Sequence, residues 1–136
     1  MKNGIAKWLL VFALSICIRF GYSQRTSDTL RLTFVGDIMG HDSQIAASID
    51  QKTGKYDYNG VFEQVAPIFK RSDFTIANLE VTLVGPLYKG YPQFSSPDEL
   101  AVACKENGID ILVTANNHSC DRRKSGIIRT IDVLDS

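Results

Sequence analysis

Polar residues of the kinds that bind metal ions follow three apolar, β-rich segments of this chain. Asp37 and His41 come after the first segment, Glu80 after the second, and Asn117 and His118 after the third. Open parallel sheets place their ligand sites at the carboxyl ends of the strands, so we expect these side chains to converge. Carboxylate, amide and imidazole groups suit a hard or borderline divalent cation. The pattern therefore predicts a metal site at one edge of a sheet.

Each of these residues also has an ordinary structural interpretation. Asp37 could cap a helix or a turn, and His41 and Glu80 could be solvent-exposed surface residues. The Asn116-Asn117 pair could form a turn, because asparagine tolerates left-handed backbone. His118 is harder to explain in this way, since it follows a strand of the buried type. The repetition of polar groups after three successive strand candidates favours the joint site.

Strand and helix patterns alternate along the chain, which predicts an α/β fold with a parallel sheet, in the order βαβαβα. Strands are expected over 30–35, 74–77 and 109–115. Helices are expected over 43–50, 61–69, 97–107 and 126–134, with irregular segments over 51–60 and 84–94. Ser96 is the expected N-cap of the third helix, with Pro97 at its first position. Three strands leave a sheet edge bare, so we expect the domain to be truncated at its C-terminus.

The first 23 residues have the pattern of a secretory signal peptide. Lys2 and Lys7 give a basic start, an apolar run covers 8–18, and small residues lie at Gly21 and Ser23. The run is shorter than the roughly 20 apolar residues that span a bilayer. Arg19 interrupts the pattern, so an uncleaved anchor remains an alternative, and a lipoprotein signal at Cys17 is a weaker one. We expect an exported protein, with a polar linker over 24–29.

Charge argues against nucleic acid as a partner. Residues 1–23 hold three basic residues and no acidic one, so their removal would leave 12 basic residues against 15 acidic ones. Nucleic-acid binding requires a basic face, which this balance does not supply. Cys104 and Cys120 could pair in an exported protein. One is expected on a helix and the other in a site loop, which makes the geometry of a disulfide doubtful.

Three short motifs resemble those of the CapA family, the capsule or poly-γ-glutamate synthesis proteins of bacteria. The first motif is Phe34-Val35-Gly36-Asp37-Ile38-Met39, and the second is Ala77-Asn78-Leu79-Glu80. The third and most specific is Ala115-Asn116-Asn117-His118, followed by Asp121 and Gly126. Residues 94–99 also fit the family's stretch before a helix, and the resemblance covers about residues 30–135. It implies part of a sandwich similar to the calcineurin-like metallophosphoesterases.

The resemblance also implies roles for individual residues. Asp37 would ligate a first metal ion, Glu80 would bridge two ions, and Asn117 would ligate the second through its amide oxygen. His118 would lie beside the substrate phosphate as an acid or electrostatic stabiliser, with Asp121 orienting it. His41 is a further candidate ligand at a variable position of the family. Two ions, most simply manganese or zinc, would clamp a phosphoryl group and activate water.

One departure from related phosphoesterases concerns histidine. Those enzymes complete their sites with further histidines from the C-terminal half, whereas this chain contains only His41 and His118. We therefore expect an open, weakly binding site, in the N-terminal portion of a CapA-like metal-dependent hydrolase. The alternative is a non-catalytic assembly or export partner in surface-polymer synthesis, and a general periplasmic phosphatase is a third, weaker interpretation. The resemblance implies membrane-bound capsule or polyglutamate synthesis proteins as partners.

Overall fold

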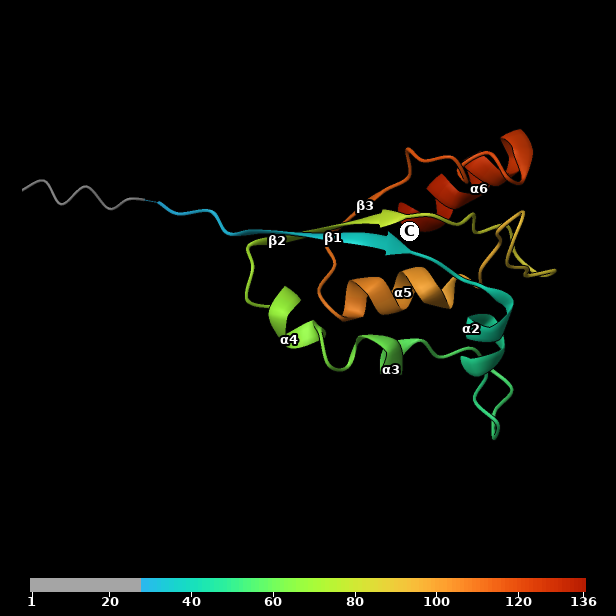
Figure 1. Ribbon diagram of the computed structural model, residues 1–136, viewed down its shortest axis with the longest axis horizontal. Helices are drawn as coiled ribbons and strands as arrows, with labels where there is room; N and C mark the ends of the chain where they lie inside the picture. Colours follow the sequence, from blue (N-terminus) through green and yellow to red (C-terminus); the bar gives the residue numbers. More distant parts are fainter. Residues whose placement is uncertain (1–27) are drawn as a thin grey trace, which may run out of the picture.

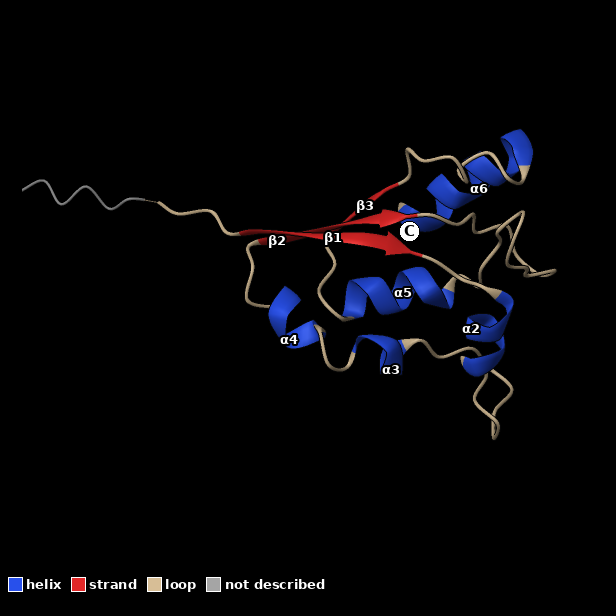
Figure 2. Cartoon of the chain, viewed as in Figure 1, coloured by secondary structure: helices blue, strands red, loops and turns tan. Residues whose placement is uncertain are grey.

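A small parallel sheet organises the chain in the computed structural model, which describes residues 28–136 (Figure 1). The elements, in chain order, are β1 Leu32–Ile38, α2 Asp42–Ala47, α3 Asn59–Phe62, α4 Ala66–Phe69, β2 Phe74–Leu79, α5 Glu99–Glu106, β3 Ile111–Val113 and α6 Arg123–Leu134. The strands lie in the order β1-β2-β3, and both pairings are parallel. The predicted α/β fold with a parallel sheet is thus confirmed, and its helices and loops are shown in Figure 2.

The expected signal peptide over 1–23 lies outside the described residues, as does most of the linker over 24–29. Residues 28 and 29 are exposed and have no regular structure. Within residues 28–136, no helix is long and apolar enough to cross a bilayer.

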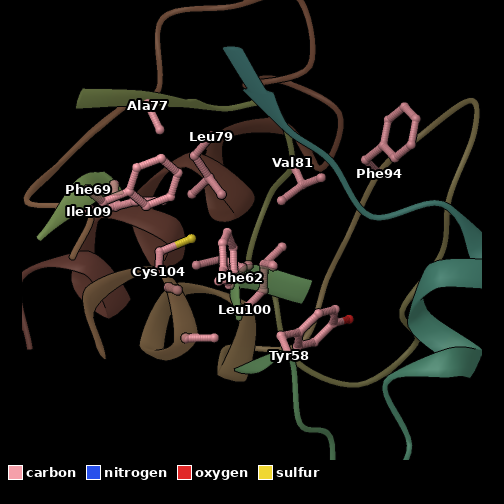
Figure 3. Close-up of a cluster of buried hydrophobic side chains, with 13 residues drawn as sticks. Tyr58, Phe62, Phe69, Ala77, Leu79, Val81, Phe94, Leu100, Cys104 and Ile109 are labelled. Carbon is pink, nitrogen blue, oxygen red and sulfur yellow. The ribbon is translucent and has the colours of Figure 1, made fainter. Parts of the chain in front are cut away.

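The hydrophobic core lies between the sheet and helices α3, α4 and α5 (Figure 3). Thr75, Ala77 and Leu79 alternate along β2 and are buried, as expected for one face of a strand. The helices and loops add the side chains of Tyr58, Phe62, Phe69, Leu83, Phe94, Leu100, Cys104 and Ile109. Val133 and Leu134, at the end of α6, pack against this cluster from outside. The core therefore joins segments from most of the described chain.

Cys104 belongs to this core and is fully buried, whereas Cys120 is exposed, and both are free thiols. Burial raises the pKa of the Cys104 thiol to about 12, since an apolar environment disfavours the thiolate. Cys104 is therefore a packing residue with little reactivity at neutral pH.

The opposite face of the sheet is apolar and open. Phe34 is 72% exposed, and the other apolar side chains that alternate onto this face are half exposed: Leu32, Phe74, Ile111 and Val113. Parallel sheets are normally covered on both faces, because their strands are hydrophobic on both sides. The polar residues Asp37, Asn78 and Glu80 follow on the same face, beyond the apolar ones.

Some predicted boundaries are wrong, for local reasons. The stripe over 61–69 forms two short helices, α3 and α4, with Pro67 in the first turn of the second. A proline lacks the backbone N–H that a continuous helix would need there. The third strand begins only at Ile111, because the Ile109 N–H closes the end of α5 by donating to the Cys104 carbonyl. It ends at Val113, where its pairing with β2 ends.

The predicted N-cap at Ser96 is also wrong, because α5 begins after Asp98. Ser96 is fully buried, and its hydroxyl has no hydrogen-bond partner among the described residues. The Asp98 carboxylate instead accepts two hydrogen bonds from Arg129 of α6, at 2.8 and 2.7 Å. Arg129 also donates to the Leu83 carbonyl, so this side chain attaches α6 to α5 and to the segment after β2.

Replacing leucine by alanine at one buried and one exposed position tests which side chains form the core. Leu83→Ala removes a fully buried side chain and should lower the free energy of unfolding by about 2–5 kcal/mol. Leu87→Ala removes a side chain that is 87% exposed and should change it by less than about 0.5 kcal/mol. Urea denaturation of both variants would measure the difference. Equal losses would contradict the packing described above.

Candidate functional site

A β-bulge in β1 places Asp37. Phe34 pairs with Ile76 and Asp37 with Asn78, so Val35 and Gly36 together lie opposite the single residue Ala77. Val35 and Ile38 are half-buried toward the core, while Asp37 is exposed. Without the extra residue, strand alternation would turn Asp37 to the face of Val35. The expectation that the strand ends before Asp37 is wrong, because pairing continues through Ile38.

Asn78 joins two carboxylates at the end of β2. Its side-chain amide nitrogen donates to Asp37 Oδ1 at 2.8 Å and to Glu80 Oε2 at 3.2 Å. The Glu80 N–H donates to the Ile38 carbonyl at 3.0 Å, which extends the alignment of the two strand ends. Partial burial raises the pKa of Glu80, and hydrogen bonding with Asp37 and the Asp37 charge add to the shift. Concentrated negative charge of this kind suits a cation.

Asn116 connects the β2 end to the loop after β3. Its Nδ2 donates to Asn78 Oδ1 and to the Leu79 carbonyl, both at 2.9 Å. Its Oδ1 accepts from the His118 N–H at 3.0 Å. One side chain therefore uses both ends of its amide to hold the third predicted motif against the second.

His118 is held by Asp121 one turn further along this loop. His118 Nδ1 lies 2.8 Å from Asp121 Oδ2, and the two side chains are only 16% and 12% exposed. The same carboxylate oxygen accepts from the Phe94 N–H at 2.7 Å. A carboxylate partner at Nδ1 favours the tautomer protonated on that nitrogen and leaves Nε2 as the free ring position.

The other two predicted ligands lie at the margin of this network. His41 is the N-cap residue of α2, where its N–H donates to Gln44 Oε1 at 2.8 Å, and it is exposed. Its ring packs edge-to-face on Phe94, with centroids 5.0 Å apart. Asn117 is exposed in the loop between the two hydrogen-bonded residues Asn116 and His118.

The structure thus brings the predicted residues into two connected groups. Asp37 and Glu80 meet on Asn78, and His118 and Asp121 meet beside Phe94; Asn116 links the two groups. Within residues 28–136, no three His, Cys, Asp or Glu side chains gather in a group that could hold a metal ion. A cation here would therefore also need amide oxygens or water as ligands.

Two members of the network were missed as site residues at the sequence level, Asn78 and Asn116. Asn78 is two residues from Glu80, so strand alternation could have placed both side chains on one face. Asn116 follows the third strand segment directly, but sequence reasoning singled out its neighbour Asn117. Only the structure shows which of the two asparagines faces β2.

The fold and the site together define a class of protein. It is an α/β protein with a parallel sheet, and carboxylate, amide and imidazole groups lie at the carboxyl edge of that sheet. Residues 31–136 match the family described as bacterial capsule synthesis protein PGA_cap, and the chain belongs to that family.

Two curated relatives support this membership. The chain is 31% identical over 113 residues to the capsule biosynthesis protein CapA of Bacillus anthracis, which covers 79% of this chain and 26% of that protein. It is 28% identical over 112 residues to the PGA biosynthesis protein CapA of Bacillus subtilis, covering 78% of this chain and 28% of the relative. The chain thus spans about a quarter of the length of these curated relatives.

The two neighbouring asparagines should behave differently when truncated. Asn116→Ala leaves Asn78 Oδ1 and the Leu79 carbonyl without their donor, and should lower the free energy of unfolding by about 1–3 kcal/mol. Asn117→Ala changes an exposed side chain and should cost less than about 0.5 kcal/mol. Chemical denaturation measures both. A larger loss for Asn117→Ala would overturn the assignment of the linking amide to Asn116.

Proposed function

We propose that this chain contributes a divalent-metal site to a phosphoester-type hydrolase of capsule or poly-γ-glutamate synthesis. The observation that carries the proposal is the meeting of the Asp37 and Glu80 carboxylates on one side-chain amide. The names of the relatives support the biosynthetic setting, as capsule and PGA biosynthesis proteins. The proposal includes export by the segment over 1–23 and action beside membrane-bound polymer-synthesis proteins.

The chemistry of the donor set fits a divalent cation. The raised pKa of Glu80 reflects partial burial together with the nearby Asp37 carboxylate, and a cation would offset the repulsion between the two charges. Carboxylate oxygens, the amide oxygen of exposed Asn117 and the imidazole of His41 are hard-to-borderline donors, which suit manganese or zinc. When bound, such a cation supplies Lewis-acid stabilisation and an activated water.

His118 is the residue of this chain best placed for proton or charge chemistry. Asp121 holds its Nδ1 at 2.8 Å, so the imidazole keeps a defined orientation with Nε2 free. Asn116 holds the His118 backbone at the same time, through the N–H. We propose that His118 donates a proton or hydrogen bond from Nε2 to a phosphoester oxygen, and that Asp121 stabilises the charged ring.

A second candidate function is a non-catalytic assembly or export partner in surface-polymer synthesis. It is favoured by the shortage of strong ligands, because within 28–136 no three His, Cys, Asp or Glu side chains form a metal-holding group. An assembly partner needs no bound cation. Metal binding by the Asp37 region therefore separates the two candidates.

Titration with Mn²⁺ tests the metal site directly. Asp37→Ala removes a carboxylate from the site and should weaken Mn²⁺ binding by at least roughly 10- to 100-fold. A loss of that size is typical even when the residue removed only hydrogen-bonds to a metal ligand. Asn117→Ala should weaken it less, because a neutral amide oxygen contributes less than a charge. Asp132→Ala, an exposed carboxylate on α6, is the matched control and should bind as the unaltered chain does. Equal binding by Asp37→Ala would make Asp37 a purely structural carboxylate.

The pKa of Glu80 predicts how that binding depends on pH. A proton and a cation compete for the Glu80 carboxylate, and its raised pKa means that competition begins at a higher pH than for an ordinary glutamate. In Asp37→Asn the charge repulsion is removed, so the pKa of Glu80 should fall. Carbon-13 NMR titration of the carboxyl groups without metal would measure the change.

Asp50 provides an internal control for this titration. Hydrogen bonds from Thr53 and Lys52 lower its pKa, and these contacts lie outside the site network. Its titration should therefore be unaffected by Asp37→Asn. A Glu80 pKa that stays the same in that variant would contradict the coupling between the two carboxylates.

A further inference from the structure

Phe94 contacts both histidines of the chain. Its ring centroid lies 5.0 Å from that of His41 and 4.6 Å from that of His118, with interplanar angles of 86° and 81°. Both pairs are edge-to-face, an arrangement that aromatic rings favour because of their quadrupoles. Phe94 itself is 1% exposed, so one buried ring lies against two imidazoles that are far apart in sequence.

The backbone of Phe94 is held from two sides. Its N–H donates to Asp121 Oδ2 at 2.7 Å, the same oxygen that contacts His118 Nδ1. Its carbonyl accepts from the buried Thr82 hydroxyl at 2.6 Å. Because both backbone groups are hydrogen-bonded, the backbone of Phe94 is fixed in position, and so is the point from which its ring reaches the imidazoles.

The loop before Phe94 is also attached to the segment that carries His41. The Gly90 N–H donates to Asp42 Oδ1 at 2.7 Å. A Cβ atom on Gly90 would lie 2.7 Å from the Asp42 nitrogen and 3.0 Å from the His41 Cα, so the two backbones are in direct contact. Lys89 and Ser95 exchange backbone hydrogen bonds of 2.9 and 2.8 Å, which close the loop between these attachments.

We propose that Phe94 is a positioning residue that sets the ring orientations of His41 and His118 together. Asp121 bonds His118 through one nitrogen only, which leaves rotation about that contact to be limited by packing. His41 has the Phe94 ring as its packed aromatic neighbour. The significance of this role for catalysis rests on the proposed function, whereas the positioning itself does not.

Nuclear magnetic resonance can test the positioning without any activity assay. The chain has two histidines, so only two sets of imidazole resonances need assignment. In the unaltered chain, nuclear Overhauser effects should connect the Phe94 ring to both imidazoles, and coupling constants should show one side-chain rotamer for each histidine. Absence of either set of Overhauser effects would overturn the proposal.

Three variants separate positioning from general packing. Phe94→Leu should shift the resonances of both imidazoles toward random-coil values and average their rotamers, while Phe94→Tyr should retain the single rotamers because it keeps the ring. Phe62→Leu, at a core position that is 4% exposed, should lower stability yet leave both imidazoles unchanged. Unaltered imidazole rotamers in a folded Phe94→Leu chain would refute the proposal. If Phe94→Leu fails to fold, the Overhauser effects in the unaltered chain and the rotamers in Phe94→Tyr decide.

Paramagnetic Mn²⁺ distinguishes this inference from the proposed function. If Mn²⁺ binds near Asp37, it should broaden the imidazole resonances. Phe94→Leu should reduce this broadening, because it falls steeply with the distance between the ion and each ring and the rings would no longer be held in one orientation. No Mn²⁺ binding by the unaltered chain would refute the metal site. The Overhauser effects and rotamers would then still decide whether Phe94 positions the two histidines. Identical broadening in Phe94→Leu would count against positioning of the histidines toward the metal.

Discussion

The side-chain amide of Asn116 is the interaction on which the arrangement of the site depends. It donates to Asn78 and to the Leu79 carbonyl and accepts from the His118 N–H, so it spans the ends of two neighbouring strands. Asn78 passes the connection on to Asp37 and Glu80. An amide is suited to this position because it carries donors and an acceptor in one rigid plane. A carboxylate at 116 would lack the donors and would add a third charge beside Asp37 and Glu80.

Electrostatics and packing place different demands on the two halves of the network. The Asp37 and Glu80 half concentrates negative charge, and partial burial together with the neighbouring Asp37 carboxylate raises the pKa of Glu80. The other half pairs the His118 imidazole with the Asp121 carboxylate and packs against the buried ring of Phe94. The neutral amides of Asn78 and Asn116 separate the two. The network therefore has a carboxylate side and an imidazole side.

Sequence patterns were sufficient for the order of the elements and for the region of the site. Apolar, β-rich segments predicted the strands containing Phe34, Ile76 and Leu112, and the parallel sheet was predicted from the helices between them. Polar residues after apolar runs predicted the sheet edge at which Asp37 and Glu80 meet. Local periodicity carries this information because each pattern lies within one element.

Features that depend on contacts between distant segments could not be predicted in the same way. The choice of Asn116 over Asn117 depends on where the loop meets β2. Asp98, which precedes α5 in place of Ser96, has a partner in the distant Arg129 that no local pattern indicates. The burial of Phe94 between the histidine-bearing segments is likewise a tertiary contact. The metal roles of Asp37, His41, Glu80 and Asn117 remain predictions.

The bulge at Val35 and Gly36 divides β1 into two parts whose side chains alternate in opposite phase. Before it, residues of odd number face the core; after it, Ile38 does. A residue's neighbours in the folded protein therefore depend on whether it is counted from the start or from the end of the strand. An insertion or deletion within 34–37 would shift this alternation by one residue. Either the apolar first part would keep its register and Asp37 would turn toward the core, or Asp37 would keep its place and the apolar residues would change faces. Among homologues, the length of this short segment should be held more strictly than the identity of most residues within it.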